Sequence, residues 1–450
     1  MKLHILKLAK YLLLTFVATL LILIVVNLKD EDFLPIPDLA EKQEPIEKSV
    51  NAYYAIVGFN AATGEDMQQT GYKVVDEFER YVIDKNDFDF KVEQVARASG
   101  LEIKGNSNEL FLFELDEKYF AYLLKNKQAI LDFKQKNHHL YKRYRKLITY
   151  QQFKEDSFYI PSWSGILTMH KLHLNLIGLE WLEGDKNRAV AMLSETMNFS
   201  RMLFDDSEML ISRMIATALL AIGLRHYSEI SRVCKNCTSL DRIIQPMSSL
   251  SRNDICLKKS FNAELKYVKR DVIKAELYDL KYDDDVNLFY WLANKYFLQP
   301  AATFNNISDV YNKLLQTCEL KTYEISTFLE RNQGKIDYDF PWYSYLYNPA
   351  GKYFLENFGF SSLSSYIDTM LYLETQIRML RLQRMIYTNN IKPDDVASYL
   401  DQQDENLKNP FTNNSFKYNK ESNMLFYGND QSKSITVPLR RNSYFTKTIL

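Results

Sequence analysis

The sequence predicts a mainly α-helical protein, made of an N-terminal transmembrane helix, an irregular α-bundle or α-solenoid-like ectodomain, and a small C-terminal β-hairpin. Two observations favour this fold class. Apolar residues recur at steps of three and four residues from residue 49 to residue 405, which is the period of amphipathic helices. Glycine and proline are scarce, with 13 and 11 in 450 residues, and turns at the spacing typical of strands are missing.

The predicted anchor covers residues 11–28, an apolar run without a charged side chain. As a helix this run is about 27 Å long, which is enough for the core of a bilayer. Three lysines precede it, in a predicted cytoplasmic tail of residues 1–10, and acidic residues follow it. The positive-inside rule therefore directs the bulk of the chain across the membrane.

A cleaved signal peptide is the alternative to an uncleaved anchor. Signal peptidase prefers small residues in an A-x-A-like pattern after the apolar run, and residues 25–29 (VVNLK) do not offer them. We therefore expect a single-pass protein of the bacterial inner membrane, with the N-terminus in the cytoplasm and the bulk of the chain in the periplasm. A eukaryotic type II membrane protein is the other possibility.

Residues 29–48 are rich in acidic side chains and contain three prolines. This composition is typical of a stiff, solvated tether, which reaches about 60 Å in polyproline II geometry. The helical ectodomain is predicted to follow it at residues 49–405.

The clearest part of the ectodomain is predicted to consist of three helices, at residues 164–183, 187–204 and 208–230. The first two are joined by a turn at Gly184-Asp185, and a cap for the third is predicted at Asp205-Asp206-Ser207. Together with Trp181 and Ala189, this turn resembles that of tetratricopeptide-type helical hairpins, but no second copy follows at a period of about 34 residues. An irregular bundle is therefore expected rather than a named repeat.

Further helices are predicted at residues 50–59, 116–150, 253–279, 285–298, 308–331 and 363–389. The period then changes, because residues 415–427 alternate between polar and apolar and turn in the middle, which indicates a β-hairpin. Residues 434–439 could add one more strand. We assign residues 406–450 to a small β appendage and tail.

Four cysteines occur, at positions 234, 237, 256 and 318. An oxidising compartment permits disulfides. Cys234 and Cys237 have the C-x-x-C spacing, but no βαβ pattern surrounds them, which disfavours a thioredoxin-like redox role. We expect one structural disulfide, between this pair or between one of its members and Cys256. Paired C-x-x-C motifs for zinc are missing.

Motifs of the common enzymatic mechanisms do not occur: G-x-S-x-G, H-E-x-x-H, Walker A and G-x-G-x-x-G are all missing. A formal net charge of −1 gives no basic footprint for nucleic acid. We expect no cofactor, and the sequence favours a non-catalytic protein over an enzyme.

Two sets of residues offer candidate chemistry. His170 and His173 lie one turn apart on a predicted helix and could face one metal ion. The sequence favours ordinary half-buried histidines instead, and we predict no metal site. Glu264 lies on a predicted internal helix and could act as a general acid in a pocket that raises its pKa. A salt bridge with Arg270 or Arg213 is the simpler interpretation.

Aromatic side chains are dense between residues 338 and 366, and sugar rings stack well on such faces. A binding site is therefore predicted at Trp342, Tyr343 and Tyr345. Because aromatic residues make up 14% of the whole chain, packing in the core is the competing interpretation.

A basic stretch is predicted on one helix, at Lys134, Lys136, Lys142, Arg143, Arg145 and Lys146, with His138 and His139 between them. It could touch anionic lipid headgroups or an acidic partner. A solvated helix face is the competing interpretation.

Three short sequence segments are similar to those of a known family. They lie at residues 51–59 (NAYYAIVGF), 348–352 (NPAGK) and 409–412 (NPFT). Together they resemble a family of uncharacterised proteobacterial envelope proteins with a signal anchor and a helical ectodomain. The likeness covers most of the chain after residue 48. It implies the architecture described above and no activity.

We therefore predict a membrane-anchored, periplasmic, non-catalytic interaction or scaffold protein of the bacterial envelope. Its expected partners are the inner membrane, through the anchor, and another envelope protein, but no nucleic acid. A hydrolase or lyase acting on an envelope glycan such as peptidoglycan is the first alternative. A carrier of lipids or small molecules is the second, and it would show an apolar cavity inside the bundle.

Overall fold

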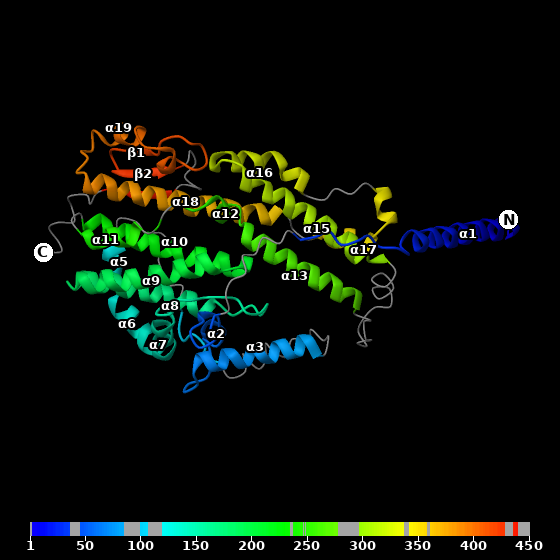
Figure 1. Ribbon diagram of the computed structural model, residues 1–450, viewed down its shortest axis with the longest axis horizontal. Helices are drawn as coiled ribbons and strands as arrows, with labels where there is room; N and C mark the ends of the chain where they lie inside the picture. Colours follow the sequence, from blue (N-terminus) through cyan, green and yellow to red (C-terminus); the bar gives the residue numbers. More distant parts are fainter. Residues whose placement is uncertain are drawn as a thin grey trace. The chain divides into compact units, whose positions relative to one another are not determined.

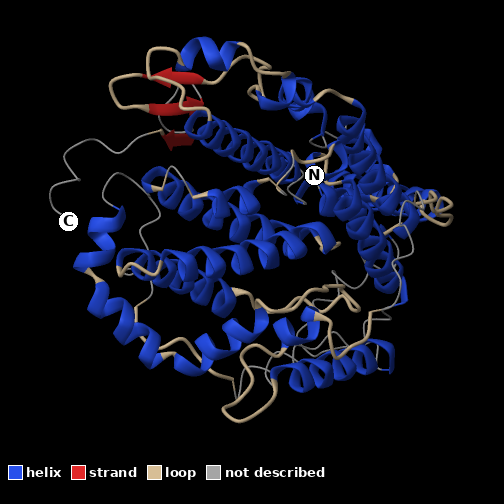
Figure 2. Ribbon diagram, turned by 60° about the vertical axis from the view of Figure 1, so that its left-hand side comes forward, coloured by secondary structure: helices blue, strands red, loops and turns tan. Residues whose placement is uncertain are grey.

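The computed structural model describes residues 2–36, 46–84, 100–106, 119–234, 237–245, 247, 249–277, 297–336, 342–357, 361–427 and 435–439. The described chain is mainly helical, as the sequence predicts, and its strands are confined to one sheet (Figures 1 and 2). It divides into two compact units. Unit 1 contains Met1–Ala40, Cys256–Leu320 and Ser326–Ile367. Unit 2 contains Glu41–Ile255, Lys321–Ile325 and Asp368–Leu450.

The predicted transmembrane anchor is not found. The chain begins with helix α1 (Lys2–Val26), but within the described ranges no helix is both long and apolar enough to cross a membrane. The prediction of a transmembrane helix at residues 11–28 is therefore wrong. Its uncharged helical part ends at Val26 and is about 24 Å long, whereas a bilayer core is about 30 Å thick.

The segment after α1 is bonded to unit 1. The amide of Asn27 donates to the carbonyl of Leu346 (2.8 Å), and its Oδ1 accepts from the backbone N–H of Asn348 (2.7 Å). Asp30 accepts from the N–H groups of Ala301 (2.7 Å) and Ala302 (3.1 Å). The first residues of the predicted tether are thus held in place, while residues 37–45 lie outside the described part of the chain.

Unit 1 is built around α13 (Lys258–Leu277) and α15 (Pro300–Leu315), which pack against each other. The rings of Phe261 and Tyr311 meet edge to face at 5.3 Å. A disulfide between Cys256, just before α13, and Cys318, in the short 3₁₀ helix η2 (Gln316–Glu319), joins the same pair. A second 3₁₀ helix, η3 (Trp342–Leu346), and α17 (Pro349–Asn357) complete the unit. The division from unit 2 falls inside α16 (Thr322–Ile336) and α18 (Ser361–Thr388).

Unit 2 has α8 (Ser164–Leu182) as its central helix, packed against α9 (Lys186–Asp206) and α10 (Leu210–Val233). α8 is apolar over most of its surface and most of its side chains are buried, as expected for a helix covered on all sides. The turn into α9 needs Gly184, whose φ of 100° is unfavourable for other residues. Asp185 then caps α9 by accepting from the N–H of Arg188 (3.1 Å). The three predicted helices are confirmed.

The start of α10 has a cap that local sequence does not reveal. Glu155 accepts hydrogen bonds from the N–H groups of Glu208 and Met209, both at 2.7 Å. Met209 immediately precedes Leu210, the first helical residue, so its N–H group has no partner within the helix and Glu155 supplies one. The sequence places this cap within residues 205–207, and that prediction is wrong.

The predicted long helix at residues 116–150 is instead three shorter ones, α5 (Tyr119–Lys125), α6 (Lys127–Lys136) and α7 (His138–Leu147). Asn137 marks the second break. Its side-chain amide donates to the carbonyl of Lys104 (2.9 Å), and its Oδ1 accepts from the N–H of the same residue (2.8 Å). This clamp on a distant segment fixes the chain direction between α6 and α7.

Two further helices of unit 2, α2 (Ala52–Val57) and α3 (Met67–Asp84), approach each other closely. A Cβ atom added to Gly71 would lie 1.8 Å from the carbonyl oxygen of Tyr54, and one added to Gly58 would lie 1.9 Å from that of Met67. Glycine is therefore required at both positions.

The last part of unit 2 combines short helices with a sheet. The helices are α11 (Thr238–Ile244), α12 (Arg252–Ile255), α19 (Val396–Asp401) and the 3₁₀ helix η4 (Glu405–Leu407). The strands β1 (Lys417–Asn419), β2 (Met424–Tyr427) and β3 (Ile435–Pro438) are antiparallel and follow this order in the sheet. The predicted hairpin is confirmed, and the predicted extra strand pairs with its second strand. Phe411 stacks on Tyr427 at 4.9 Å and also contacts Tyr372 of α18.

Candidate functional site

An open cavity of about 570 Å³ lies on the surface of unit 2. It is lined by Lys134, Tyr141, Arg145, Arg188, Ala191, Met192 and Glu195. These residues come from α6, α7 and α9, whose positions can be followed in Figure 1.

Helical spacing explains how the cavity forms. Tyr141 and Arg145 are four residues apart and share one face of α7. On α9, Arg188, Met192 and Glu195 follow one another at steps of four and three residues, so they form a stripe along one face. Side chains of the two helices meet where the guanidinium of Arg145 contacts the carboxylate of Glu195, with 3.1 Å between nitrogen and oxygen.

Positive charge predominates in the cavity. Three of its lining residues are cationic and one is anionic. Arg145 is paired with Glu195, and Arg188 is paired with Glu180 at 3.1 Å. The ammonium group of Lys134 lies 5.3 Å from the centre of the Tyr141 ring. Because these pairs are partly exposed, each contributes at most about 1 kcal/mol and is readily exchanged for another partner.

His173 on α8 supports the cavity from the buried side. Its Nε2 lies 3.1 Å from Nη1 of Arg145, and its Nδ1 lies 3.0 Å from the hydroxyl of Tyr141. A guanidinium can only donate, so Nε2 must be the acceptor and Nδ1 must carry the proton. Burial lowers the pKa of His173 well below its usual value, and the charge of Arg145 lowers it further. The ring is therefore neutral.

Two other buried histidines are held in a similar way. His170 lies 3.0 Å from the carbonyl oxygen of Leu219 through Nε2, which must donate, and 2.7 Å from the Tyr144 hydroxyl through Nδ1, which must accept. His226 pairs through Nδ1 with the hydroxyl of Tyr119 at 2.7 Å. Burial lowers the pKa of both His170 and His226 to about 3.

These contacts decide the outcome for the two histidines that the sequence singles out. His170 and His173 use both ring nitrogens for tyrosine, backbone and arginine groups, so neither has a nitrogen left for a metal ion. Among the described residues, no group of three or more potential ligands gathers around one point.

The basic stretch predicted from the sequence has divided roles. Lys134 and Arg145 line the cavity. Arg143 instead donates to the backbone carbonyls of Phe59, Ala62 and Glu65, and to that of Ala61, so it fixes the loop after α2. Lys146 pairs with Asp66 at 3.1 Å.

Sequence reasoning missed Tyr141, Arg188, Met192 and Glu195 as site residues. Arg188 and Glu195 lie on a helix that is about fifty residues away along the chain, so the basic stretch gives no hint of them. A usable signal was present, since Arg188, Met192 and Glu195 recur at helical spacing on the predicted helix 187–204.

The predicted aromatic site stays a prediction. Tyr345 is half-buried on η3, and the side chains of Trp342 and Tyr343 lie outside the described part of the structure. Glu264 on α13 is half-buried. Burial of Tyr311 raises the pKa of its hydroxyl, and the negative charge of Glu264 raises that pKa further. It lines neither of the two cavities described here.

The four cysteines form two disulfides, Cys234–Cys237 and Cys256–Cys318. The structure thus joins the C-x-x-C pair to itself. The alternative prediction, a bond from that pair to Cys256, is wrong because Cys256 lies beside Cys318, with 5.2 Å between their Cα atoms.

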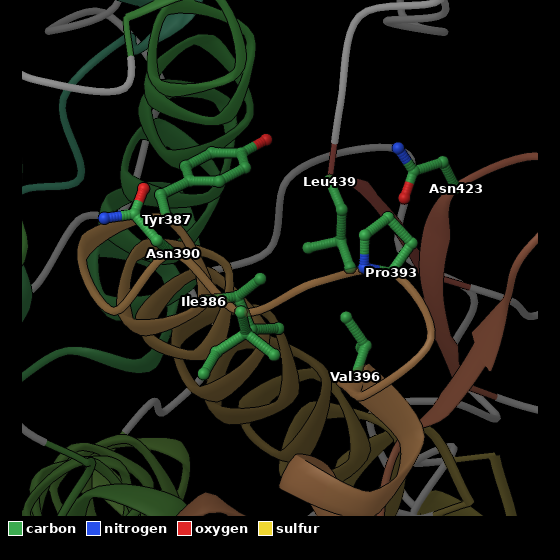
Figure 3. A pocket seen from close by; sticks show the side chains of 8 residues that line it. Ile386, Tyr387, Asn390, Pro393, Val396, Asn423 and Leu439 are labelled. Carbon is green, nitrogen blue, oxygen red and sulfur yellow. The ribbon is translucent and has the colours of Figure 1, made fainter.

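A second, smaller cavity of about 130 Å³ lies at the end of α18. Figure 3 shows Pro393, Val396 and Leu439 on one side of it and Ile386 on the other. Both apolar side chains and the polar side chains of Asn390 and Asn423 line this cavity. Pockets for small molecules usually have volumes of about 300 Å³ or more.

Comparison of the chain with known proteins gave no match, either to a family model, to a curated protein or to a solved structure.

Proposed function

We propose that this protein is a non-catalytic interaction or scaffold protein of the bacterial envelope, and that it holds an acidic partner at the cavity between α7 and α9. The observation that carries the proposal is the surface built from Lys134, Arg145 and Arg188 around the apolar floor of Ala191 and Met192. Charged rims around an apolar centre are typical of protein–protein contacts.

Two disulfides support a location in an oxidising compartment, since such bonds form and persist outside the cytoplasm. For a bacterial envelope protein, we propose the periplasm. The resemblance of residues 51–59, 348–352 and 409–412 to envelope proteins agrees with this location and stays a prediction.

The two alternatives have less support. A glycan hydrolase would need a pair of carboxylates in a cleft. Glu264 lines neither cavity, and Glu195 is the one carboxylate among the residues that line the larger cavity, where it is paired with Arg145. A lipid or small-molecule carrier would need a large, enclosed apolar cavity. The cavity at the end of α18 is too small, and the larger cavity is open and has four charged side chains in its lining.

The proposal is tested by crosslinking in living cells, followed by affinity purification and mass spectrometry of the full chain. The cavity variant is Lys134→Glu with Arg188→Glu. The control is Lys136→Glu with Lys186→Glu, which makes the same change of charge on the same two helices but outside the cavity, at exposed positions.

We expect one partner protein to be recovered with the natural chain and with the control, and to be lost with the cavity variant. Recovery of that partner with the cavity variant, or its equal loss with both variants, would show that the cavity is not the binding surface. Recovery of no partner at all would refute the scaffold function.

A further inference from the structure

We infer that the cavity is a groove that binds an extended acidic peptide segment. In the absence of that segment, Glu195 forms the ion pair with Arg145 that a carboxylate of the segment would form. The inference rests on the proposed function, because it names the chemistry by which the partner is recognised. Four features of the site carry it: the direction of its hydrogen bonds, its length, its two apolar groups, and the exposed ion pair inside it.

The side chains that line the groove mainly offer hydrogen-bond donors to a ligand. Arg145 donates to Nε2 of His173, so the Nδ1–H of His173 donates to the oxygen of Tyr141. The hydroxyl proton of Tyr141 then points to another acceptor. Lys134 and Arg188 also carry only donors. A ligand that satisfies these groups must present acceptors, and oxyanions are the strongest of them.

The length of the groove suits a peptide. The stripe from Arg188 to Glu195 runs about 10 Å along α9, and Tyr141 to Arg145 runs about 6 Å along α7. An extended chain rises about 3.3 Å per residue, so about three residues fit between the two walls. In such a segment, alternate side chains point to the same side and are about 7 Å apart, which matches cations spread along a groove rather than gathered at one point.

The groove also has contacts for more than charge. Ala191 is exposed and Met192 is half-buried between the charged side chains. These two apolar groups can cover the backbone and the methylene groups of a glutamate-rich segment. A free inorganic anion would leave them in water, so the peptide makes better use of the site.

Glu195 shows how a carboxylate binds there. Its side chain and that of Arg145 are about one-third exposed, at 32% and 35%. An exposed pair of this kind is weak, and a carboxylate of a ligand can replace Glu195 without leaving a buried charge unpaired. Glu195 therefore competes with the ligand, and its removal should strengthen binding.

The test is a binding titration on the purified full chain with its disulfides intact. The probe is a fluorescein-labelled hexaglutamate peptide, compared with the hexaglutamine peptide and with inorganic phosphate as a competitor. Glu195→Gln removes the competitor inside the groove. Glu183→Gln is the matched control. This substitution makes the same change of charge, but Glu183 is exposed and does not line the groove.

We expect Glu195→Gln to bind hexaglutamate up to about fivefold more tightly and Glu183→Gln to bind it unchanged. Tyr141→Phe, which keeps the ring and the charge, should bind about three- to tenfold more weakly. Hexaglutamine should not bind, and millimolar phosphate should not displace hexaglutamate. Thermal unfolding of each variant shows whether it is folded.

Equal effects of Glu195→Gln and Glu183→Gln would refute the inference, because the binding would then follow net charge alone. Displacement by phosphate would refute it in favour of a free oxyanion as the ligand. If the variants behave as expected but no partner is found in cells, the groove stands and the scaffold function fails. If a partner is found but hexaglutamate does not bind, the partner uses another surface and the groove fails.

Discussion

His170, His173 and His226 each share a ring nitrogen with a tyrosine hydroxyl inside unit 2. His170 and His173 have partners at both ring nitrogens and are opposite tautomers. His170 donates from Nε2 to a carbonyl, whereas His173 accepts at Nε2 from Arg145. The contact with Arg145 requires a neutral His173, and burial lowers the pKa of His170 and His226, which keeps these two rings neutral. Their burial thus couples the stability of the fold to pH.

The sign of this coupling follows from the lowered pKa values. The pKa is about 3 for His170 and His226 in the fold, against 6.5 for an ordinary histidine. The stabilisation is therefore fully present above about pH 6.5 and is lost as the pH falls toward 3, since the unfolded chain binds protons that the fold excludes. Each of these two histidines therefore lowers the free energy of unfolding as the pH falls between these two values.

We expect the free energy of unfolding to decrease from pH 6 to pH 4, and to decrease less steeply in His226→Gln, which has no titrating ring. Urea unfolding at several pH values measures both slopes. The His138→Gln variant is the control, because His138 is exposed. Identical slopes for all three proteins would contradict the coupling.

Glu155 acts in the opposite direction. Burial raises the pKa of this carboxyl to about 6, although the N–H groups of Met209 and Glu208 partly oppose the shift. A raised pKa in the fold means that its contribution is present at low pH and is lost as the pH rises through 6. Above that pH Glu155 is ionised and still accepts the two hydrogen bonds before α10. Burying this charge away from water lowers the free energy of unfolding.

At the scale of elements, caps and glycines decide where helices begin and meet. Asp30 caps α15 from a position about 270 residues earlier in the chain. Pro300 occupies the first turn of α15 and has no N–H, so the two N–H groups that follow it are the ones that Asp30 satisfies. The cap joins the segment after α1 to the core of unit 1.

Asp30→Ala should therefore lower the free energy of unfolding by about 0.5–2 kcal/mol, the usual cost of losing a carboxylate cap. Asp32→Ala is the control, because Asp32 is exposed and contacts Asn305 through its backbone carbonyl; its effect should stay within about 0.5 kcal/mol. Chemical denaturation measures both. Equal losses would show that the charge of the segment, and not the cap, stabilises α15.

At the scale of the whole molecule, two disulfides differ in what they hold together. Cys256–Cys318 joins residues 62 positions apart in unit 1, whereas Cys234–Cys237 joins residues 3 positions apart in unit 2. A crosslink restricts the unfolded chain more when the loop it closes is longer. The first bond should therefore stabilise the protein more than the second.

The double variant Cys256→Ser with Cys318→Ser should lose about 4 kcal/mol of stability in the loop-entropy view, and Cys234→Ser with Cys237→Ser about 2 kcal/mol. Thermal unfolding of both variants under oxidising conditions compares them. A larger loss from the C-x-x-C pair would contradict the structural interpretation and would point to a special role for that pair.

Much of the architecture could be predicted from local sequence. The helices at residues 164–183, 187–204 and 208–230 follow from the spacing of apolar residues, and Gly184-Asp185 marks the turn because only glycine accepts that φ without strain. The hairpin at residues 415–427 follows from alternation around a turn. Such features depend on neighbours within a few positions, which a sequence displays directly.

Only the tertiary structure decided the remaining features, because each depends on residues that are distant in the sequence. Lys104 bonds Asn137 and divides a predicted helix, and Glu155 caps α10. The end of α1 at Val26 shortens the uncharged helical run that suggested a membrane span. Packing of α7 and α9 on α8 brings the cations of the groove together. The sequence by itself determined that the protein is mainly helical and where its most periodic helices lie. The folded chain determined where other helices break and which side chains meet, since local periodicity contains no information on which faces pack against each other.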